Sequence, residues 1–542
     1  MTGSTHPLLE VDDLVVSYDT AHGPVHAVNG VSLRVLPGEI TAIVGESGSG
    51  KSTTAQAAIG LLPANARIDA GEVRLDGRSV AELSDREWRP LRGTRIGLIP
   101  QDPNNSLNPV RTIGESVGEG LAIHRRGSAE ERRTRVIELL TRVGIDHPGK
   151  RHDQYPHELS GGMKQRALIA AALALEPELI IADEPTSALD VTVQKVILDL
   201  LDDMRRELNL GVLFITHDLA VAGDRADHIV VMERGEVRES GYAATVLTDP
   251  QHPYTRQLLA DAPSLATATV NGDRRRVPAP EAEPLLSVGS VTQRYGDFTA
   301  VDDVSFAVAR GSTHAIVGES GSGKTTLGRS IAAFNQPTEG SIVIDGHEIT
   351  TAAPRQRREL RRSVQLVYQN PYSSLNPRQT VGSAIAEPLR NFTGVSRREA
   401  ERQVHHHLDL VSLDRATAQR RPAELSGGQR QRVAIARALI LEPELVVLDE
   451  AVSALDVTVQ AQILRLLDEL QQELGLTYVF ISHDLAVVRQ ISDTVSVMSR
   501  GRQVEYGATA DVFDHPESEF TRNLIDAIPG SNYRGGVLNL GL

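Results

Sequence analysis

Cysteine is absent from this chain of 542 residues. Disulfides, thiolate zinc sites and cysteine-ligated iron–sulfur clusters are therefore excluded, and a reducing compartment fits the sequence. Basic residues are outnumbered, because 56 Lys and Arg stand against 71 Asp and Glu, for a formal charge of −15. Proteins that mainly bind nucleic-acid phosphates usually have the opposite balance, at least locally. The composition thus argues against nucleic acid as the partner.

Long apolar runs are absent as well. No stretch reaches the roughly 18 uninterrupted apolar residues of a membrane-spanning helix, and the longest candidate, residues 167–182, is interrupted by Glu176, Pro177 and Glu178. Residues 1–7 lack the basic start and apolar run of a signal peptide. We therefore expect a soluble, cytoplasmic chain. Its hydrophobic share of 40% is ordinary for a folded α/β protein.

The two halves of the sequence repeat each other. VGESGSGKST at residues 44–53 recurs as VGESGSGKTT at residues 317–326, an offset of 273 residues. ELSGG, SALDVTVQ and the HDLAV segment each recur at an offset of 266 residues. This long period indicates two homologous domains rather than a solenoid of short repeats. The difference of seven residues between the offsets predicts that one loop or helix between the first two motifs is shorter in the second copy.

We place the first domain at residues 1–263, a linker at residues 264–284 and the second domain at residues 285–542. The linker has few apolar residues, several prolines and clustered charge, which is typical of an exposed tether. Its arginines at 274–276 allow two interpretations, a nucleic-acid patch or a solvated tether. The acidic residues that follow them favour the tether.

Each copy begins with β-strand patterns, at residues 14–18 and 31–35 in the first and at residues 301–308 in the second. The Asp-Gly pairs at 76–77 and 345–346 follow short apolar runs and predict hairpin turns. Continuous apolar runs come next, and they predict buried parallel strands that alternate with helices, as in a nucleotide-binding α/β core. In the first copy these runs are residues 40–44, 179–182 and 212–215.

Both copies contain the phosphate-loop pattern G-x-x-x-x-G-K-S/T directly after an apolar strand. Glycines let such a loop close around phosphate, and the amides at the start of the next helix attract the anion. Lys51 and Lys324, two of only five lysines in the chain, add a full charge, and Ser52 and Thr325 can offer a hydroxyl to Mg²⁺. The expected phosphate-binding residues are Gly45, Ser47, Gly48, Gly50, Lys51, Ser52 and Thr53, and Gly318, Ser320, Gly321, Gly323, Lys324, Thr325 and Thr326.

Paired acids end two apolar strands, as Asp183-Glu184 in the first copy and Asp449-Glu450 in the second. The first acid can hold Mg²⁺ through water, and the second can orient or deprotonate the attacking water, because phosphoryl transfer needs mainly positioning and charge stabilisation. A solvated turn would explain one such pair alone. The pairs follow the loop lysines by 132 and 125 residues, and this repeated placement favours catalysis.

Ser160 and Ser426 each precede two glycines and a helical run rich in Ala, Arg and Ile. A serine cap with free amides behind it is an anion site, although simple helix capping would explain either motif alone. Further polar residues recur at matching positions in both copies, and together they oppose the capping interpretation. They are Gln101, Gln369, Asp190, Asp456, His217 and His483.

With these motifs the sequence resembles the ATP-binding-cassette (ABC) family twice, over nearly the whole chain. The resemblance implies two tandem P-loop NTPase domains of the α/β class, each with a RecA-like parallel-sheet core, an antiparallel β subdomain and an α-helical subdomain. It also implies a signature motif, a D-loop, a switch histidine and an adenine-stacking tyrosine in each domain, although a tyrosine in a strand is more commonly a core residue. These roles fall on Ser160, Gly161, Gly162, Asp190, His217 and Tyr18, and on Ser426, Gly427, Gly428, Asp456, His483 and Tyr295.

The cofactors implied are ATP and Mg²⁺, with Glu184, Glu450, His217 and His483 as catalytic residues. In this family the phosphate loop of one domain faces the signature motif of the other. The resemblance thus pairs Lys51 with Ser426 and Gly428, and Lys324 with Ser160 and Gly162. The implied metal ligands are Ser52, Gln101 and Asp183, and Thr325, Gln369 and Asp449.

Residues 101–109 and 369–377, which are QDPNNSLNP and QNPYSSLNP, resemble the Q-loop of dipeptide, oligopeptide and nickel importers. The tail HPYTRQLL at residues 252–259 is similar to the tail of these importers, and residues 515–524 are a weaker repeat of it in the second copy. That subfamily usually has two separate ATPase chains, whereas here both are joined. Many of its members carry a cysteine cluster after this tail, which the present chain cannot, so an iron–sulfur role is excluded.

The resemblance implies the motor subunit of a binding-protein-dependent importer, peripheral to the cytoplasmic face of the inner membrane. Its partners would be two permease subunits and an external solute-binding protein, with membrane contact through the permeases only. Residues 101–160 and 369–425 would touch the permeases. The ATPase does not touch the cargo, so peptide is a family inference, and nickel, glutathione or glycosides stay open.

A second class also has tandem cassettes, namely ribosome-associated translation factors and DNA-repair ATPases. Those proteins typically add a long basic linker, zinc modules or arms. The short linker, the absence of cysteine and the acidic charge favour the importer.

One departure separates the two copies. Pro185-Thr186 after the first glutamate becomes Ala451-Val452 after the second. The proline's fixed φ and the threonine hydroxyl are lost, but both acids remain. We expect both sites to hydrolyse ATP, at unequal rates.

Overall fold

The computed structural model describes residues 6–20, 23–80, 82–186, 189–265, 283–369, 374–453 and 455–530. The chain forms two compact units, the first comprising most of residues 6–265 and the second most of residues 283–528. The expected tether, with Arg274–Arg276, falls almost entirely on residues 266–282, outside the described residues. Within the described ranges, every helix is too short or too polar to cross a membrane.

The first unit begins with an antiparallel sheet in the order β2-β1-β4-β5. The predicted hairpin is confirmed, because Asp76 and Gly77 (φ 49° and 73°) connect Leu75 to its partner Arg78. Both turn residues take the left-handed conformation that a two-residue type I′ turn requires, which explains the Asp-Gly pair. The strands are β1 (Leu9–Thr20), β2 (Gly23–Val35), β4 (Ala66–Leu75) and β5 (Arg78–Ser79).

The core of the first unit is a second sheet in the order β10-β9-β3-β8-β7-β6, parallel except for the β9/β10 pair. The three apolar runs expected to be buried strands are β3, β7 and β8. Because parallel neighbours end at the same edge, this edge collects the residues that follow them. The strands are β3 (Ile40–Val44), β6 (Ile96–Ile99), β7 (Leu179–Asp183), β8 (Gly211–Thr216), β9 (His228–Glu233) and β10 (Glu236–Tyr242).

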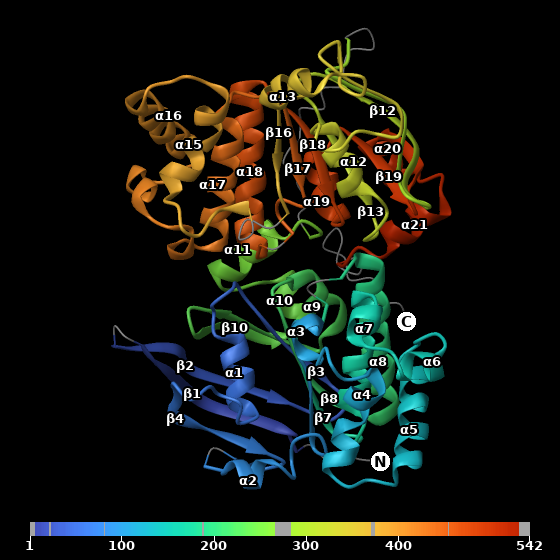
Figure 1. Cartoon of the computed structure of the whole chain (residues 1–542). Helices are drawn as coiled ribbons and strands as arrows, with labels where there is room; N and C mark the ends of the chain where they lie inside the picture. Colours follow the sequence, from blue (N-terminus) through green and yellow to red (C-terminus); the bar gives the residue numbers. More distant parts are fainter. Residues whose placement is uncertain are drawn as a thin grey trace. The chain divides into compact units, whose positions relative to one another are not determined.

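Helices α4 to α7 form a helical part beside the core strands (Figure 1). Helix α5 illustrates why these segments are helical and pack together. Ser128 and Glu131 form a capping box at its start. Its apolar residues Val136, Leu139 and Leu140 are buried on one face. The helices of the unit are α1 (Lys51–Ala58), α2 (Asp85–Trp88), α3 (Pro103–Ser106), α4 (Ile113–Ile123), α5 (Ala129–Arg142), α6 (Pro148–His152), α7 (Gly161–Leu173), α8 (Val191–Leu208), α9 (Leu219–Arg225), α10 (Ala243–Thr248) and α11 (Pro253–Asp261).

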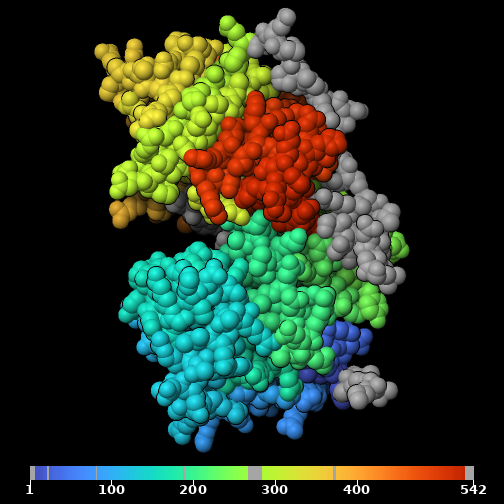
Figure 2. All heavy atoms as spheres, turned by 90° about the vertical axis from the view of Figure 1, so that its right-hand side faces the viewer, coloured from blue at the N-terminus to red at the C-terminus, as the bar shows by residue number. Residues whose placement is uncertain are grey.

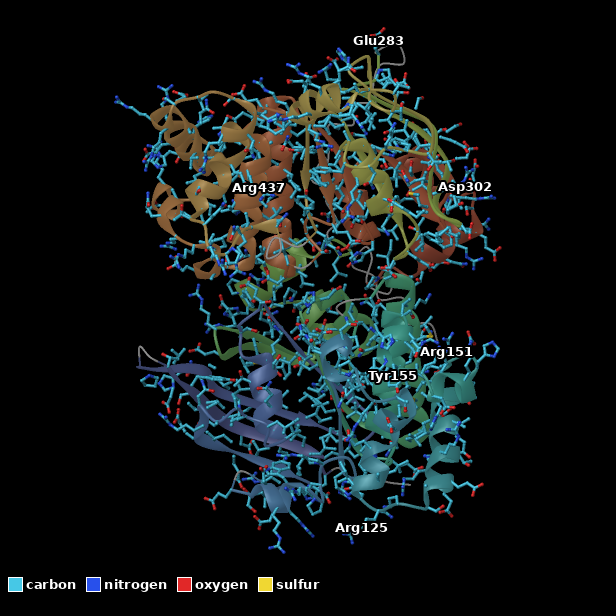
Figure 3. All side chains as sticks on the ribbon, viewed as in Figure 1. Arg125, Arg151, Tyr155, Glu283, Asp302 and Arg437 are labelled. Carbon is cyan, nitrogen blue, oxygen red and sulfur yellow. The ribbon has the colours of Figure 1, made fainter. Side chains whose placement is uncertain are left out.

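The second unit repeats these elements, but its two sheets join into one of ten strands. The joint is a pairing of β12 with β20 at Asp302 and Arg502, whose side chains also form an ion pair at 2.8 Å (Asp302 is marked in Figure 3). The strands are β11 (Leu286–Tyr295), β12 (Phe298–Val308), β13 (Thr313–Gly318), β14 (Glu339–Ile344), β15 (His347–Glu348), β16 (Val364–Val367), β17 (Leu445–Asp449), β18 (Thr477–Ser482), β19 (Thr494–Ser499) and β20 (Arg502–Ala508).

The helices of the second unit follow the same order as those of the first. Its last strands and helices gather on one face (red in Figure 2). The helices are α12 (Lys324–Ile331), α13 (Pro354–Ser363), α15 (Val381–Phe392), α16 (Arg397–Leu410), α17 (Gly427–Leu439), α18 (Val457–Leu474), α19 (Leu485–Ile491), α20 (Thr509–Asp514) and α21 (Glu519–Asp526).

The expectation of a single shorter loop or helix in the second copy is wrong. Four of the seven residues are missing between the loop lysine and the hairpin Asp-Gly, one between the hairpin and the Q-loop glutamine, and two between that glutamine and the signature serine. The first four residues are lost from a strand, because β4 has ten residues and β14 has six. The other three are lost where loops and short helices connect the larger elements, and such connections tolerate length changes.

Candidate active site

The phosphate loops follow β3 and β13, and their glycines are required by close backbone contacts. A Cβ on Gly45 would lie 2.1 Å from the carbonyl oxygen of Met232, and one on Gly318 would lie 2.1 Å from that of Met498. Gly48, in contrast, has φ 80°, and a Cβ added to it would meet no atom within 4 Å. The loop thus packs tightly on the sheet edge and is open on the side of Gly48, as a phosphate cradle requires.

The two loop lysines are buried within their own loops. Lys51 Nζ donates to the carbonyl oxygens of Gly45 and Glu46 at 2.7 and 2.8 Å. Lys324 makes the same two contacts with Gly318 and Glu319, both at 2.8 Å. Burial lowers the pKa of Lys324, an effect that the nearby Glu450 carboxylate opposes. The arrangement holds a cation at the start of α1 and of α12, where an anion also meets the helix amides.

A hydroxyl and a carboxylate lie side by side next to each lysine. Ser52 Oγ donates to Asp183 Oδ1 at 3.1 Å, and Thr325 Oγ1 donates to Asp449 Oδ1 at 3.0 Å. Burial raises the pKa of both aspartates. A hard divalent cation would offset this desolvation. Mg²⁺ prefers oxygen ligands of this kind and takes its remaining ones from phosphate and water, so the donor set fits Mg²⁺.

The glutamate that follows each aspartate is held by two side chains. In the first unit, Gln101 Nε2 donates to Glu184 Oε2 at 2.8 Å, and His217 Nδ1 lies 3.3 Å from the same oxygen. Burial alone would raise the pKa of Glu184, but its hydrogen bond and ionic interaction with His217 hold that pKa below the usual value. Burial likewise opposes protonation of His217, and Glu184 nevertheless raises its pKa. Each residue thus favours the charged form of the other.

The second unit repeats this cluster. Gln369 Nε2 donates to Glu450 Oε2 at 2.6 Å, and His483 Nδ1 lies 3.4 Å from that oxygen. The pKa shifts of Glu450 and His483 have the same directions as in the first unit, with burial opposed by the contact between the two residues. The structure thus brings together the predicted Lys, Ser or Thr, Gln, Asp, Glu and His in each unit separately.

The backbone of the two glutamates is a feature that the sequence analysis missed. Glu184 and Glu450 have φ 44° and 49°, in the left-handed region that non-glycine residues rarely occupy. Their amides donate to the carbonyl oxygens of Ile215 and Ile481 at 2.9 and 3.0 Å. The change from Pro185-Thr186 to Ala451-Val452 therefore leaves the glutamate in place, and the expected difference in rate stays a prediction.

The two tyrosines differ in their surroundings. The half-buried Tyr18 shares a hydrogen bond of 3.2 Å with the hydroxyl of Thr53 in α1, which places the ring beside the phosphate loop. Tyr295 is 52% exposed, and its hydroxyl accepts from Asn335 Nδ2 at 3.2 Å. Stacking on adenine stays a prediction for both.

The signature serines cap long helices. Ser160 Oγ accepts from the Met163 amide at 3.4 Å at the start of α7, and Ser426 Oγ accepts from Gln429 at 3.3 Å at the start of α17. Both lie in the helical part of their own unit. Asp456 caps α18 in the same way, and Asp190 directly precedes α8. Of the SALD segments to which these aspartates belong, Ser187, Ala188 and Ala454 lie outside the described residues.

Each cluster can carry out phosphoryl transfer to water. A buried cation at a helix start, an oxygen pair for Mg²⁺ and an ionised carboxylate suit that chemistry, which needs positioning and charge stabilisation more than covalent steps.

The chain is also similar in sequence to known ATP-binding proteins of transporters. Residues 28–187 and 301–453 match the family described as ABC transporter, and residues 238–285 match the oligopeptide/dipeptide transporter C-terminal region. The chain is 44% identical to the peptidoglycan transport ATP-binding protein YejF of Agrobacterium fabrum, over 97% of both chains. It is 43% identical to the glutathione import ATP-binding protein GsiA of Salmonella choleraesuis, over 96% of this chain and 89% of that protein. It is 41% identical to the oligopeptide transport ATP-binding protein OppD of Mycobacterium tuberculosis, over 96% of this chain and 98% of that protein.

Proposed function

Because the chain belongs to the ABC transporter family, we propose that it is the ATP-hydrolysing motor subunit of a binding-protein-dependent importer of di- or oligopeptides. The observation that carries the proposal is the pair of complete Lys-Asp-Glu-His clusters, one in each unit. The match of residues 238–285 to the oligopeptide/dipeptide transporter region supports peptide as the cargo. Relatives named for peptidoglycan, glutathione and oligopeptide transport point to the same class of solute.

In the first unit, the loop amides and Lys51 would bind the β- and γ-phosphates of ATP, and Tyr18 would lie against the base. Ser52, Asp183 and Gln101 would hold Mg²⁺, which neutralises the charge that develops on the phosphates. The ionised Glu184 would orient the attacking water and take its proton, since it is an acceptor held in place by Gln101 and His217.

In the second unit the same roles would fall on Lys324, Thr325, Asp449, Glu450 and His483. The head-to-tail pairing implied by the family resemblance stays a prediction. Ser426→Arg tests it, because hydrolysis at the Lys51 site should then be lost; site-resolved nucleotide trapping that finds only the Lys324 site impaired would exclude the pairing.

The proposed function also implies partner proteins for this chain and a location in the cell. We propose two permease subunits and an extracytoplasmic solute-binding protein as partners, with the chain at the cytoplasmic face of the inner membrane and in contact with the membrane only through the permeases. A role on ribosomes or nucleic acid is the alternative, and neither the acidic charge nor the matched relatives favour it.

Reconstitution decides between them. The chain is combined with its permeases and binding protein in vesicles, and ATP hydrolysis is measured with a peptide library, glutathione, nickel and glycosides in turn. We expect peptide to stimulate hydrolysis through the binding protein. Stimulation by ribosomes or nucleic acid, with no response to any solute, would contradict the importer.

A further inference from the structure

The side chain of Tyr254 contacts the first phosphate loop. Tyr254 is the second residue of α11, and its hydroxyl accepts a hydrogen bond from the Glu46 backbone amide at 3.3 Å. The ring is half-buried against the core of the first unit. Tyr254 belongs to the HPYT tail segment, 208 residues from the loop that it touches. A tail that marks the subfamily in sequence thus reaches an ATP-binding element.

This contact holds one end of a peptide group whose other end is held by Lys51. The Glu46 amide belongs to the Gly45–Glu46 peptide, and the carbonyl oxygen of that peptide accepts from Lys51 Nζ at 2.7 Å. The peptide is planar, so fixing its N–H and its carbonyl fixes its orientation. If Lys51 turned from this carbonyl to a nucleotide phosphate, the Tyr254 hydroxyl would still hold the amide. The loop would then keep its shape while its lysine changed partner.

Helix α21 of the second unit corresponds to α11, but it has no tyrosine hydroxyl at the matching position. Glu239 accepts the amides of residues 251 and 252 before α11, and Glu505 accepts those of residues 517 and 518 before α21. The N-caps His252 and Ser518 accept from the amides of Tyr254 and Phe520, respectively. Phe520 therefore occupies the position of Tyr254. Its ring carries no acceptor for the Glu319 amide.

We infer that Tyr254 is a positioning residue that favours ATP binding at the first phosphate loop, and that the second loop binds ATP without this support. The inference rests on the proposed function, in which both loops bind ATP. The net contribution of one neutral hydrogen bond corresponds to about a two- to tenfold change in Kd. The hydroxyl acts through the loop backbone and does not itself touch the nucleotide.

The test uses the full chain with one site silenced. In a Lys324→Ala background, the Kd for a fluorescent ATP analogue with Mg²⁺ is measured before and after Tyr254→Phe. We expect Kd to rise about two- to tenfold, and KM for ATP to rise with it while kcat changes less than about twofold. The melting temperature without nucleotide should shift by less than about 2 °C. The matched control is Phe520→Leu in a Lys51→Ala background, which should leave the Kd of the second loop unchanged.

Two outcomes would overturn the inference. They are an unchanged Kd in Tyr254→Phe, whether or not its melting temperature falls, and an equal rise in Kd from Phe520→Leu, which would assign the effect to packing. The double variant Lys51→Ala/Lys324→Ala separates this from the proposed function. If ATP binding persists there, the loops are not the ATP sites and the proposed function fails; if binding is lost there but Tyr254→Phe has no effect, only the inference fails.

Discussion

Glu184 and His217 form an ion pair in which imidazole Nδ1 lies 3.3 Å from carboxylate Oε2, and Glu450 and His483 repeat it at 3.4 Å. The glutamate side chains are only 14% and 13% exposed. A buried carboxylate is ordinarily a weak candidate for an ionised base, because desolvation favours its neutral form. The histidine reverses this preference, so each glutamate is available as a proton acceptor and is held in one orientation.

The first prediction follows from these two carboxylates. Glu184→Gln combined with Glu450→Gln should abolish ATP turnover, since the amide keeps the shape and loses the acceptor charge. Binding of ATP should persist, because the loop amides, the lysines and the Ser/Thr–Asp pairs are untouched. Steady-state hydrolysis and ATP affinity of the double variant are the measurements. Hydrolysis at the wild-type rate would exclude both residues as bases.

The second prediction contrasts two glycines of one loop. Gly45→Ala should prevent the native loop, because its Cβ would lie 2.1 Å from a backbone carbonyl that cannot move cheaply. Gly48→Ala meets no atom within 4 Å and strains only its φ of 80°, at a cost of about 1 kcal/mol. Urea unfolding should show a much larger loss of stability for Gly45→Ala. Equal losses in the two variants would contradict the close packing of Gly45 on Met232.

Much of this arrangement could be predicted from the sequence. The loop lysines, paired acids and buried strands follow from local rules, because a strand, a glycine loop and a helix start are adjacent in the chain. The same holds for the hairpins at Asp76-Gly77 and Asp345-Gly346, whose positive φ values suit these residues.

Other features depend on contacts between distant segments. The left-handed φ of Glu184 accompanies a hydrogen bond from its amide to the carbonyl oxygen of Ile215 in another strand, and the local sequence does not predict it. The Tyr254–Glu46 contact spans 208 residues. The two sheets of the second unit join because β12 and β20 lie side by side. The pairing of Asp302 with Arg502 at this joint becomes visible only in the folded structure.

A buried histidine near that joint was likewise not predictable. In the second unit His314 stacks on Phe306, with ring centroids 4.2 Å apart, and bonds to the hydroxyls of Thr494 and Ser496 at 2.8 and 3.0 Å. The corresponding residue in the first unit is Thr41, which lines a cavity of about 440 Å³ between the two sheets. The histidine thus occupies space that stays open in the first unit.

The third prediction uses this histidine. Burial lowers the pKa of His314 from 6.5 to about 3. Because the folded-state pKa lies below the unfolded one, its contribution to stability is complete above pH 6.5 and is lost progressively as the pH falls toward 3, by up to about 1.4 kcal/mol per pH unit. His314→Thr should remove this slope. Urea unfolding at pH 7, 6 and 5 measures it, and parallel pH profiles for the two proteins would refute the assignment.

The last prediction concerns the two glutamates as a pair. Glu450 has nearly the same φ and the same contacts as Glu184, so Ala451-Val452 does not displace it. What differs is restraint: the Pro185 ring fixes its own φ directly after Glu184, whereas the φ of Ala451 is free to vary. A residue in a rarely occupied conformation loses more of its productive population when its neighbour in the chain is less restrained. A tenfold change in rate needs only about 1.4 kcal/mol.

We therefore expect Glu184→Gln alone to remove more ATPase activity from the assembled transporter than Glu450→Gln alone, and expect Ala451→Pro with Val452→Thr to narrow the difference. If Glu450→Gln were the more damaging change, restraint by Pro185 would not govern the rate.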